Sequence, residues 1–254
     1  MTDQVNDLPP GFGRALELLR LINPSAEGFR PGQWEAISAL VVDHSKVVLV
    51  QRTGWGKSAV YFIATRMLRD QGRGPTLIVS PLLALMRNQI EMAERAGIVA
   101  VTINSTNPTD WALIEEELDR DRIDLLLISP ERLNNERFAR DVLPGLLNRV
   151  GLLVVDEVHC ISDWGHDFRP DYRRLARIVE SLPPGTPVLG TTATANDRVV
   201  ADVVTQFGAN LQVVRGTLDR ESLALQVIGL PDAADRLAWL LHVVPTLEGS
   251  GIIY

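Results

Sequence analysis

Short, nearly uninterrupted apolar runs recur along the chain, and each is followed by a longer amphipathic stretch. The runs are rich in Val, Ile and Leu and cover residues 46–51, 76–80, 99–103, 124–129, 151–156 and 187–193. Runs of this kind predict strands that are buried on both faces, as in a parallel sheet. The amphipathic stretches predict helices over residues 13–22, 34–42, 57–70, 83–97, 109–120, 132–148, 169–181 and 195–207. This alternation predicts an α/β fold with a mostly parallel central sheet flanked by helices.

The pattern weakens after residue 208. LQVVRGT (211–217) and LALQVIG (223–229) could form two short strands, and PDAADRLAWLLHVV (231–244) predicts a helix with a proline near its start. The closing GSGIIY fits either a frayed terminus or the first strand of a further domain, and we expect the latter. The sequence is then a fragment that ends as a second domain opens.

Composition and charge narrow the class of protein. Of the 254 residues 46% are hydrophobic, enough for a sizeable core, and the 22% that are charged are dispersed rather than blocked. There is no apolar leader at the N-terminus and no run long enough to span a bilayer. The single cysteine, Cys160, can form no internal disulfide and no zinc cluster alone, and we expect a small core residue. These features predict a soluble, cytoplasmic protein.

The net charge of −7 bears on the partners of the protein. An acidic chain does not have the broadly basic surface of a DNA-coating protein. A local basic groove remains compatible with this charge, because a ligand responds to the field nearest to it.

The segment QRTGWGKS (51–58) connects the first predicted strand to a predicted helix. It is similar to the phosphate-loop pattern G-x-x-x-x-G-K-[ST], except that Gln51 replaces the first glycine and Trp55 lies inside the loop. In such a loop, backbone N–H groups hold a phosphate, Lys57 adds a positive charge and Ser58 offers a hydroxyl to Mg²⁺. Because GK[ST] is frequent by chance, the loop alone supports a nucleotide site and a glycine-rich turn about equally.

A second polar motif follows the strand GLLVVD, where two adjacent carboxylates precede a histidine. Asp156 can hold Mg²⁺ through water, and Glu157 can orient and polarise an attacking water. Two adjacent carboxylates at a strand end are costly without a cation or another partner. DEVH by itself would be interpreted as a solvated turn, with His159 a packed, hydrogen-bonded residue. Together with the phosphate-loop segment at another strand end, the DEVH motif indicates a Mg²⁺-dependent NTPase.

The chain also resembles a known family. The motifs that carry the resemblance are QRTGWGKS, IVSPLLALMRNQ (78–89), TINS (102–105), ISPERL (128–133), DEVHCISDWGHDFRPDYRRL (156–175) and LGTTATA (189–195). In this order they resemble the motor motifs of RecQ-type superfamily 2 DNA helicases, and FRPGQWEAI (29–37) resembles the adenine-recognition motif of that family. The similarity runs from about residue 12 to the end, and its most specific part is DEVH continuing into SDWGHDFRPDY.

The resemblance implies a RecA-like P-loop NTPase domain that uses ATP and Mg²⁺ and acts on single-stranded and duplex DNA, with 3′-to-5′ polarity. The catalytic residues it implies are Lys57, Asp156, Glu157 and His159, the last of which would couple the ATP site to DNA. Nucleotide contacts are implied for Arg30, Gln33, Thr53, Gly54, Trp55, Gly56, Lys57 and Ser58, and magnesium contacts for Ser58 and Asp156.

Three positions depart from the family pattern. Family members often have an aromatic residue where this chain has Ala26, four residues before Arg30, so the adenine stack would be one-sided. Gln51 is a modest departure, since members do not need the first glycine. Trp55 is a larger one, because the family commonly has glycine there. We expect Trp55 to have an ordinary backbone angle and an outward side chain.

The same resemblance implies contacts with DNA. The segments that would track a strand contain Ser80, Pro81, Asn104, Ser105 and Ser129 to Arg132, and the aromatic-rich loop that senses single strands contains Trp164, His166, Asp167, Phe168 and Arg169. Thr191, Thr192 and Thr194 match the motif that links hydrolysis to unwinding. Trp164, Phe168 and Tyr172 would supply stacking faces among positive charges, as single-strand binding requires. We interpret Arg173, Arg174 and Arg177 instead as a solvated helix face.

These predictions divide the chain into an N-terminal lead-in (1–28), the first RecA-like domain (29–208), and a linker with the start of a second such domain (209–254). The second domain would supply an arginine finger. Three alternatives remain: an RNA helicase of the DEAD/DEAH kind, a module that binds ATP and DNA without turnover, and a P-loop switch or transport ATPase. The aromatic-rich loop disfavours the first, and the motifs at 78–89 and 161–172 would be unexplained by the last. The sequence does not specify the oligomeric state.

Overall fold

The structure is a computed structural model, and it describes residues 8–81, 83–103, 107, 110–162, 172–208, 211–217 and 224–253. The chain divides into two compact units, Met1–Leu218 and Asp219–Tyr254. Among the described residues, no helix is long and apolar enough to cross a membrane.

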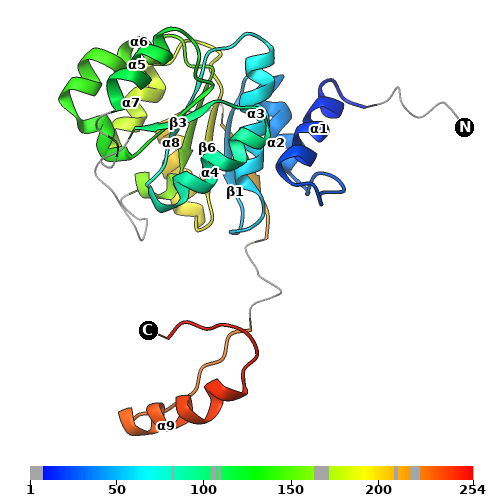
Figure 1. Cartoon of the computed structure of the whole chain (residues 1–254), viewed down its shortest axis with the longest axis vertical. Helices are drawn as coiled ribbons and strands as arrows, with labels where there is room; N and C mark the ends of the chain where they lie inside the picture. The colour runs from blue at the N-terminus through cyan, green and yellow to red at the C-terminus, as the bar shows by residue number, and fades with distance from the viewer. Residues whose placement is uncertain are drawn as a thin grey trace, which may run out of the picture. The chain divides into compact units, whose positions relative to one another are not determined.

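The first unit is built around a seven-stranded sheet in which every pairing is parallel (Figure 1). The strands are β1 (Lys46–Val50), β2 (Thr76–Val79), β3 (Ala100–Ile103), β4 (Leu125–Ile128), β5 (Leu152–Asp156), β6 (Val188–Thr192) and β7 (Leu211–Arg215), in the spatial order β3-β4-β2-β5-β6-β1-β7. All six predicted strands are present, and LQVVRGT supplies the seventh. The sheet therefore extends past residue 208, where the sequence placed the end of the domain.

Helices cover both faces of the sheet, as Figure 1 shows for α1, α2 and α3 on one side and α5, α6 and α7 on the other. The helices of this unit are α1 (Phe12–Ile22), α2 (Gln33–Val41), α3 (Lys57–Asp70), α4 (Leu83–Arg95), α5 (Trp111–Asp119), α6 (Leu143–Leu147), α7 (Arg173–Ser181) and α8 (Asp197–Phe207). Local chemistry sets several of their ends. Asn196, for example, caps α8 by accepting a hydrogen bond from the Val199 N–H at 2.9 Å.

The core explains why the strands read as continuous apolar runs. In β1, Val47 and Leu49 belong to the buried cluster on one face, and Val48 and Val50 belong to the cluster on the other. Successive strand side chains point to opposite faces, so a sheet covered on both faces needs apolar residues at every position. Helix α1 also contributes buried residues to the first cluster, so the N-terminal lead-in is part of the core.

One predicted helix, over residues 132–148, is wrong as a continuous element. The chain there forms a 3-10 turn, η2 (Pro130–Asn134), a π-helical turn, η3 (Phe138–Val142), and then the short α6. The helical states run from 136 to 147, through Pro144, and the break lies at Asn135, between η2 and this stretch. A proline removes one backbone N–H donor from a helix and its ring crowds the preceding turn, and the π-helical turn η3 directly precedes α6, which contains Pro144.

A second element, the strand proposed for LALQVIG, is also wrong over the described residues 224–229, which have no strand conformation. Leu225 and Val227 are 88% and 90% exposed. A strand needs a pairing partner, and none is present for this segment in the described part of the unit. The helix predicted after it is confirmed as α9 (Ala233–Val243), which has no buried residues.

Candidate active site

The polar motifs of the sequence meet at the carboxyl edge of the sheet. β6 lies between β5 and β1, and its last residues align with theirs: Thr191 is paired with Asp156, and Thr192 with Val50. Gln51 continues this register by donating its N–H to the Thr192 carbonyl at 3.0 Å. The phosphate loop, the DEVH motif and the paired threonines are thus brought together, where ligands bind in open α/β sheets.

The loop after β1 has the backbone of a phosphate-binding turn. Gly54 and Gly56 have φ angles of 79° and 99°, in the left-handed region that favours glycine, and α3 begins directly after them. The Lys57 ammonium donates to the carbonyls of Gln51 at 2.7 Å and Arg52 at 3.3 Å, within the loop itself. The N-terminus of the 14-residue α3 adds unpaired N–H groups and a positive dipole end, so the loop can bind an anionic group.

Replacing Lys57 with alanine is expected to weaken nucleotide binding by roughly tenfold to a hundredfold, the usual value of a charge-assisted hydrogen bond. The measurement is a titration with a fluorescent ATP analogue. The sequence contains only one other lysine, Lys46, whose ammonium donates to the Phe207 carbonyl at 2.6 Å at the amino end of β1. Lys46→Ala is therefore the matched control, and equal affinities for the two variants would contradict the prediction.

Arg30 and Gln33, for which adenine contacts are predicted, lie against the phosphate loop. The Arg30 guanidinium donates to the Gly54 carbonyl at 2.6 Å, and the Gln33 amide donates to the carbonyls of Trp55 and Gly56 at 3.3 and 3.4 Å. The Gln33 Oε1 accepts from the Arg30 N–H at 2.8 Å, which joins the two residues. They therefore tie the segment before α2 to the phosphate loop.

A cavity of about 310 Å³ opens beside this contact. It is lined by Gly54 and Gly56 of the loop and Ser58 at the start of α3, and on the other side by Arg30 and by Gln33, the first residue of α2. Ala26 also lines it, at the position where the family often has an aromatic residue. The cavity is at the lower end of the range for small-molecule sites, and its position suits a nucleotide whose base is stacked from one side only.

Trp55 differs from its prediction. Its backbone angle is ordinary, as expected, because it is absent from the described non-glycine residues with positive φ. Its side chain does not point outward: it is 7% exposed and belongs to the core cluster that includes residues of α1, α2 and α3. The indole lies near Gly32, the N-cap residue of α2, where a Cβ would be 3.7 Å from the ring, an ordinary contact distance. Burial of an indole removes a large apolar surface from water, which favours the buried position over an exposed one.

Gln51, the other departure from the phosphate-loop pattern, does not form the turn at all. Its side chain is 3% exposed and lies against Gly216, where a Cβ would come within 2.2 Å of the Gln51 Oε1. The Gly216 N–H in turn donates to the Val50 carbonyl at 3.1 Å. Gln51 therefore packs the end of β1 against the segment after β7, while the later glycines make the turn.

Asp156 is enclosed by hydrogen bonds at the end of β5. Its two carboxylate oxygens accept from the Thr191 hydroxyl at 2.5 Å and the Ser80 hydroxyl at 3.1 Å, and its carbonyl accepts from the Tyr172 hydroxyl at 2.9 Å. The side chain is 9% exposed. Burial raises the pKa of Asp156, the negative charge of Glu157 raises it further, and the two hydroxyl donors oppose these effects. Such a carboxylate is suited to a cation.

Because its pKa is raised by folding, ionised Asp156 opposes folding. Its contribution to stability is present at low pH and is lost as the pH rises through the raised pKa. Asp156→Asn should therefore increase the thermal unfolding temperature at neutral pH, and the increase should shrink at about pH 4. Asp43→Asn, at an exposed aspartate, is the control. Thermal unfolding at both pH values checks this, and a lower unfolding temperature for Asp156→Asn at neutral pH would be inconsistent with it.

Glu157 occupies a strained position next to Asp156. Its φ of 51° and ψ of 46° are left-handed, which is uncommon for a side chain other than glycine, asparagine or aspartate. Its Oε2 lies 3.1 Å from His159 Nδ1, which is also 2.9 Å from the Thr192 hydroxyl. The Thr192 hydroxyl accepts from the Thr194 N–H at 3.2 Å. His159 thus connects the DEVH motif to the threonine motif, as a coupling residue would.

Magnesium was assigned to Ser58 and Asp156. The phenol of Tyr61, one turn after Ser58 on α3, interacts with the Ser58 side chain and lies within electrostatic range of Asp156. Burial raises the pKa of Tyr61, and the Asp156 charge adds to this effect. In the described part of the chain, no group of three or more His, Cys, Asp or Glu side chains could hold a metal alone. The donors fit Mg²⁺ held largely by nucleotide phosphates, with one or two protein oxygens.

The structure places several residues with predicted DNA contacts inside the protein. Ser80 and Ser129 are buried, at 0% and 8% exposure, and the Ser80 hydroxyl is bonded to Asp156, so neither side chain is available to a DNA strand. Pro81 is half-buried. Ser80 directly follows β2 and Ser129 directly follows β4. Their small side chains fit between the closely packed ends of these parallel strands.

Arg132 is buried as well, at 6% exposure. Its guanidinium lies 3.5 Å from the centroid of the Trp111 ring and 5.0 Å from that of Phe138. Its Nε has no hydrogen-bond partner, and burial lowers the pKa of Arg132. The cation is stabilised by two aromatic rings, so the predicted DNA contact is not made in this arrangement.

The remaining predicted DNA contacts fall outside the described residues: Asn104, Ser105, Trp164, His166, Asp167, Phe168 and Arg169. Tyr172 is described and differs from its prediction. It is completely buried and bonded to the Asp156 carbonyl, so it anchors the DEVH strand and offers no stacking face. Arg174 and Arg177 are exposed on α7, in agreement with the solvated face expected for them.

Sequence patterns overlooked two contributors to this site. Tyr61 lies in an apolar helix face whose other members are core residues, and only its position one turn after Ser58 pointed to a role. The prediction of a DNA contact for Ser80 rests on its place near the start of the motif at 78–89, although a hydroxyl that follows a strand beside a carboxylate is equally suited to orient that carboxylate.

A sequence model of the family described as DEAD/DEAH box helicase matches residues 30–203 of the chain. The match covers most of the chain, including the phosphate loop, the DEVH motif and the threonine motif. The chain belongs to the DEAD/DEAH box helicase family.

Curated relatives of the chain are named as DNA helicases. A putative ATP-dependent DNA helicase Q1 from Caenorhabditis briggsae is 35% identical over 90% of this chain and 37% of its own length. The ATP-dependent DNA helicase RecQ from Bacillus subtilis is 37% identical over 80% of this chain and 33% of its own length. The probable ATP-dependent DNA helicase RecS of the same bacterium is 34% identical over 89% of this chain and 44% of its own length. The chain thus spans less than half the length of these relatives.

Solved structures confirm the RecA-like helicase fold. The crystal structure of a hypothetical ATP-dependent RNA helicase from Sulfolobus tokodaii aligns with a TM-score of 0.60 at 18% identity, over 79% of this chain and 56% of that chain. The crystal structure of the Hef helicase domain from Pyrococcus furiosus aligns with a TM-score of 0.54 at 18% identity, over 73% of this chain and 38% of that chain. At these identities the likeness concerns the fold alone.

Proposed function

We propose that the chain is the first motor domain of a RecQ-like, ATP-dependent DNA helicase, which couples MgATP hydrolysis to 3′-to-5′ movement on single-stranded DNA and to duplex unwinding. One observation carries the proposal. Asp156, Glu157 and His159 are joined to Thr191 and Thr192 by short polar contacts, at the edge of the sheet that also holds the phosphate loop.

Each residue of the site would have a separate role in ATP hydrolysis. The N–H groups at the start of α3 and the Lys57 ammonium would bind the β- and γ-phosphates. Bound Mg²⁺, held by Ser58 and Asp156, would neutralise charge that develops on the phosphates. Glu157, held at the strand end beside His159, would orient the attacking water and accept its proton. Arg30 and Gln33 would hold the adenine, because both already contact the loop.

Hydrolysis would be transmitted to DNA through the threonine motif. A change at Glu157 reaches Thr192 through His159, and Thr192 bonds the backbone of Thr194. The aromatic-rich loop, 161–172, directly follows the DEVH motif. A movement at the nucleotide would therefore be transmitted to the segment that we propose binds single-stranded DNA. A second RecA-like domain would complete the ATP site with an arginine finger.

DNA is preferred to RNA as the substrate because the relatives that match most of the chain are named as DNA helicases. An enzyme of this kind acts where DNA is present, and we place it in the cytoplasm, at the nucleoid of a bacterial-type cell. The second candidate function, an ATP- and DNA-binding module without turnover, is supported by the partial coverage of those relatives.

The test is MgATP binding and hydrolysis by this chain, alone, with single-stranded DNA and with single-stranded RNA of matched sequence. We expect nucleotide binding, with turnover stimulated by DNA and much less by RNA. Binding of both ATP and DNA without turnover would identify the second candidate function. Stimulation by RNA alone would favour an RNA helicase, and absence of MgATP binding would overturn the assignment of the site.

A further inference from the structure

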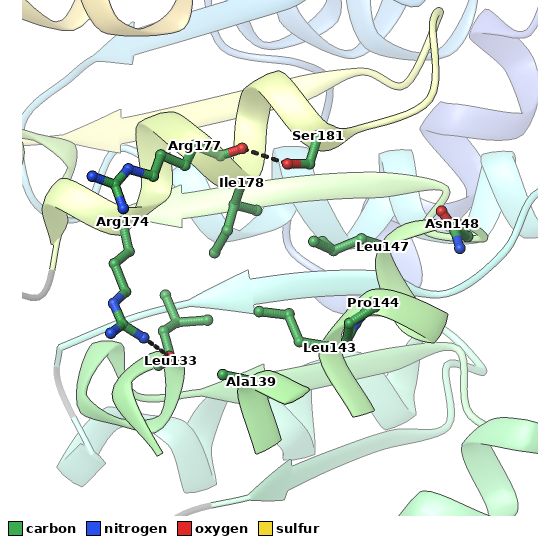
Figure 2. A pocket seen from close by; sticks show the side chains of 10 residues that line it. All are labelled: Leu133, Ala139, Leu143, Pro144, Leu147, Asn148, Arg174, Arg177, Ile178 and Ser181. Atoms are coloured by element: carbon green, nitrogen blue, oxygen red, sulfur yellow. Dashed lines mark hydrogen bonds between the residues drawn. The ribbon is translucent and has the colours of Figure 1, made fainter. Parts of the chain in front are cut away.

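A second cavity, of about 390 Å³, lies between α7 and the irregular segment made of η2, η3 and α6 (Figure 2). No predicted catalytic or DNA-binding residue lines it. Its walls are aliphatic: Leu143 and Leu147 come from α6, Ile178 comes from α7, and Leu133 comes from η2. We call this cavity the α7 groove.

The α7 groove also carries positive charge. Figure 2 shows Arg174 and Arg177 toward one end and Asn148 at the other, with the aliphatic side chains between them. Arg174 donates to the Leu133 carbonyl at 2.9 Å. Neither arginine forms an ion pair with a carboxylate of the described residues, unlike the nearby Arg140, which pairs with Asp141.

Two unneutralised arginines three residues apart on one helix are unfavourable for the helix itself. An acidic ligand would remove this repulsion and would gain charge-assisted hydrogen bonds to both guanidinium groups. The aliphatic walls would at the same time shelter an apolar side chain from water. The groove is therefore complementary to a ligand with carboxylates at one end and an apolar group beside them.

Nucleic acid is a poorer match. Single-strand sites combine positive charge with aromatic rings on which bases stack, and the residues that line the α7 groove include no aromatic side chain. Sugar and phosphate groups would also leave the aliphatic walls without an apolar partner. Peptide segments supply both features within a few residues.

We propose that the α7 groove binds a short acidic segment of a partner protein, with a leucine-like side chain between Leu143 and Ile178 and a carboxylate at Arg174 and Arg177. The occupied helix is connected to the catalytic edge, because Tyr172, directly before α7, bonds the Asp156 carbonyl. A partner bound here would contact the helix that anchors the DEVH strand. The proposal does not depend on ATP hydrolysis by this chain.

The first experiment measures binding of a fluorescein-labelled peptide, Gly-Leu-Leu-Glu-Glu-Gly, to the whole chain by fluorescence anisotropy. The two control peptides replace both glutamates with glutamine or both leucines with serine. We expect saturable binding of the first peptide and about tenfold weaker binding of each control. Absence of saturable binding, or equal affinity for the glutamine peptide, would overturn the proposal.

The second experiment locates the site with variants. Arg177→Gln removes an exposed guanidinium and should weaken peptide binding by about tenfold. Ala139→Trp should fill the α7 groove and block binding by steric exclusion. Arg20→Gln, at an exposed arginine on α1, is the matched control and should bind as the unmodified chain does.

Thermal unfolding establishes that each variant is folded before binding is compared. Equal affinity for Arg177→Gln and the unmodified chain would overturn the proposal. A single-stranded oligonucleotide supplies the last arm. The oligonucleotide could displace the peptide and also bind the Arg177→Gln variant less tightly than the unmodified chain. The arginines would then belong to a nucleic-acid interface, and this result would overturn the proposal.

Discussion

Glu157→Gln is expected to lower the rate of ATP hydrolysis by about 10² to 10⁴-fold, the usual contribution of a general base, while nucleotide binding is retained. The glutamate is held at the strand end by its left-handed backbone and by the contact with His159 Nδ1, and its side chain remains 24% exposed. Glutamine preserves the size of the side chain but cannot accept a proton from water. The change therefore removes the chemistry and leaves the phosphate loop intact.

The measurement combines the steady-state rate of MgATP hydrolysis in the presence of single-stranded DNA with a separate nucleotide titration. Glu180→Gln, at an exposed glutamate of α7, serves as the control and should change neither quantity. An undiminished hydrolysis rate in Glu157→Gln would show that another group activates the water. Loss of nucleotide binding together with the rate would assign Glu157 a structural role instead.

Trp55→Ala is expected to lower the free energy of unfolding by about 3 kcal/mol, as large-to-small substitutions of buried aromatics do. The indole is 7% exposed and belongs to the core cluster shared by α1, α2 and α3. Its removal would leave a cavity beside Gly32 and Val214, at the junction of the phosphate loop and β7. The effect should therefore be one of stability rather than of loop chemistry.

Urea unfolding of the whole chain, followed by circular dichroism, provides the measurement. Trp239→Ala is the matched control, because this tryptophan lies on α9, a helix with no buried residues, and its removal should cost well under 1 kcal/mol. Equal costs for the two substitutions would contradict the burial of Trp55. The outward side chain expected from the sequence would then be correct.

Most of the fold could be predicted from the sequence because the inner strands β1, β2, β4, β5 and β6 are buried on both faces. That environment demands apolar residues at consecutive positions, a pattern that no surface strand requires, and all six predicted strands are present. The predicted helix at 132–148 shows the limit of periodicity: apolar spacing runs through the whole segment, but the backbone is non-helical at Asn135 and has a 3-10 turn before it and a π-helical turn before Pro144. LALQVIG failed for a different reason, since strand-like residues form a strand only when a neighbour pairs with them.

The catalytic part of the site was also predictable, because its chemistry needs particular residue types at strand ends. Adjacent carboxylates after an apolar strand are costly without a cation or another partner, and a lysine after glycines matches the pattern of a phosphate loop. The two motifs are informative because they occur together at strand ends. Ser80, Arg132 and Tyr172 were assigned to DNA by their motifs, yet they lie inside the protein. Motif membership does not report the direction of a side chain, which depends on what packs around it.

The sequence by itself determined the parallel α/β fold, the phosphate loop and the DEVH motif, since local pattern and residue chemistry are sufficient for each. The tertiary structure alone decided the neighbours of these motifs. It placed Trp55 in the core and set Ser80 and Tyr172 against Asp156. It also left Arg174 and Arg177 beside an aliphatic groove, without carboxylate partners among the residues that the structure describes. Burial and pairing depend on contacts between residues far apart in the chain, and no local pattern encodes them.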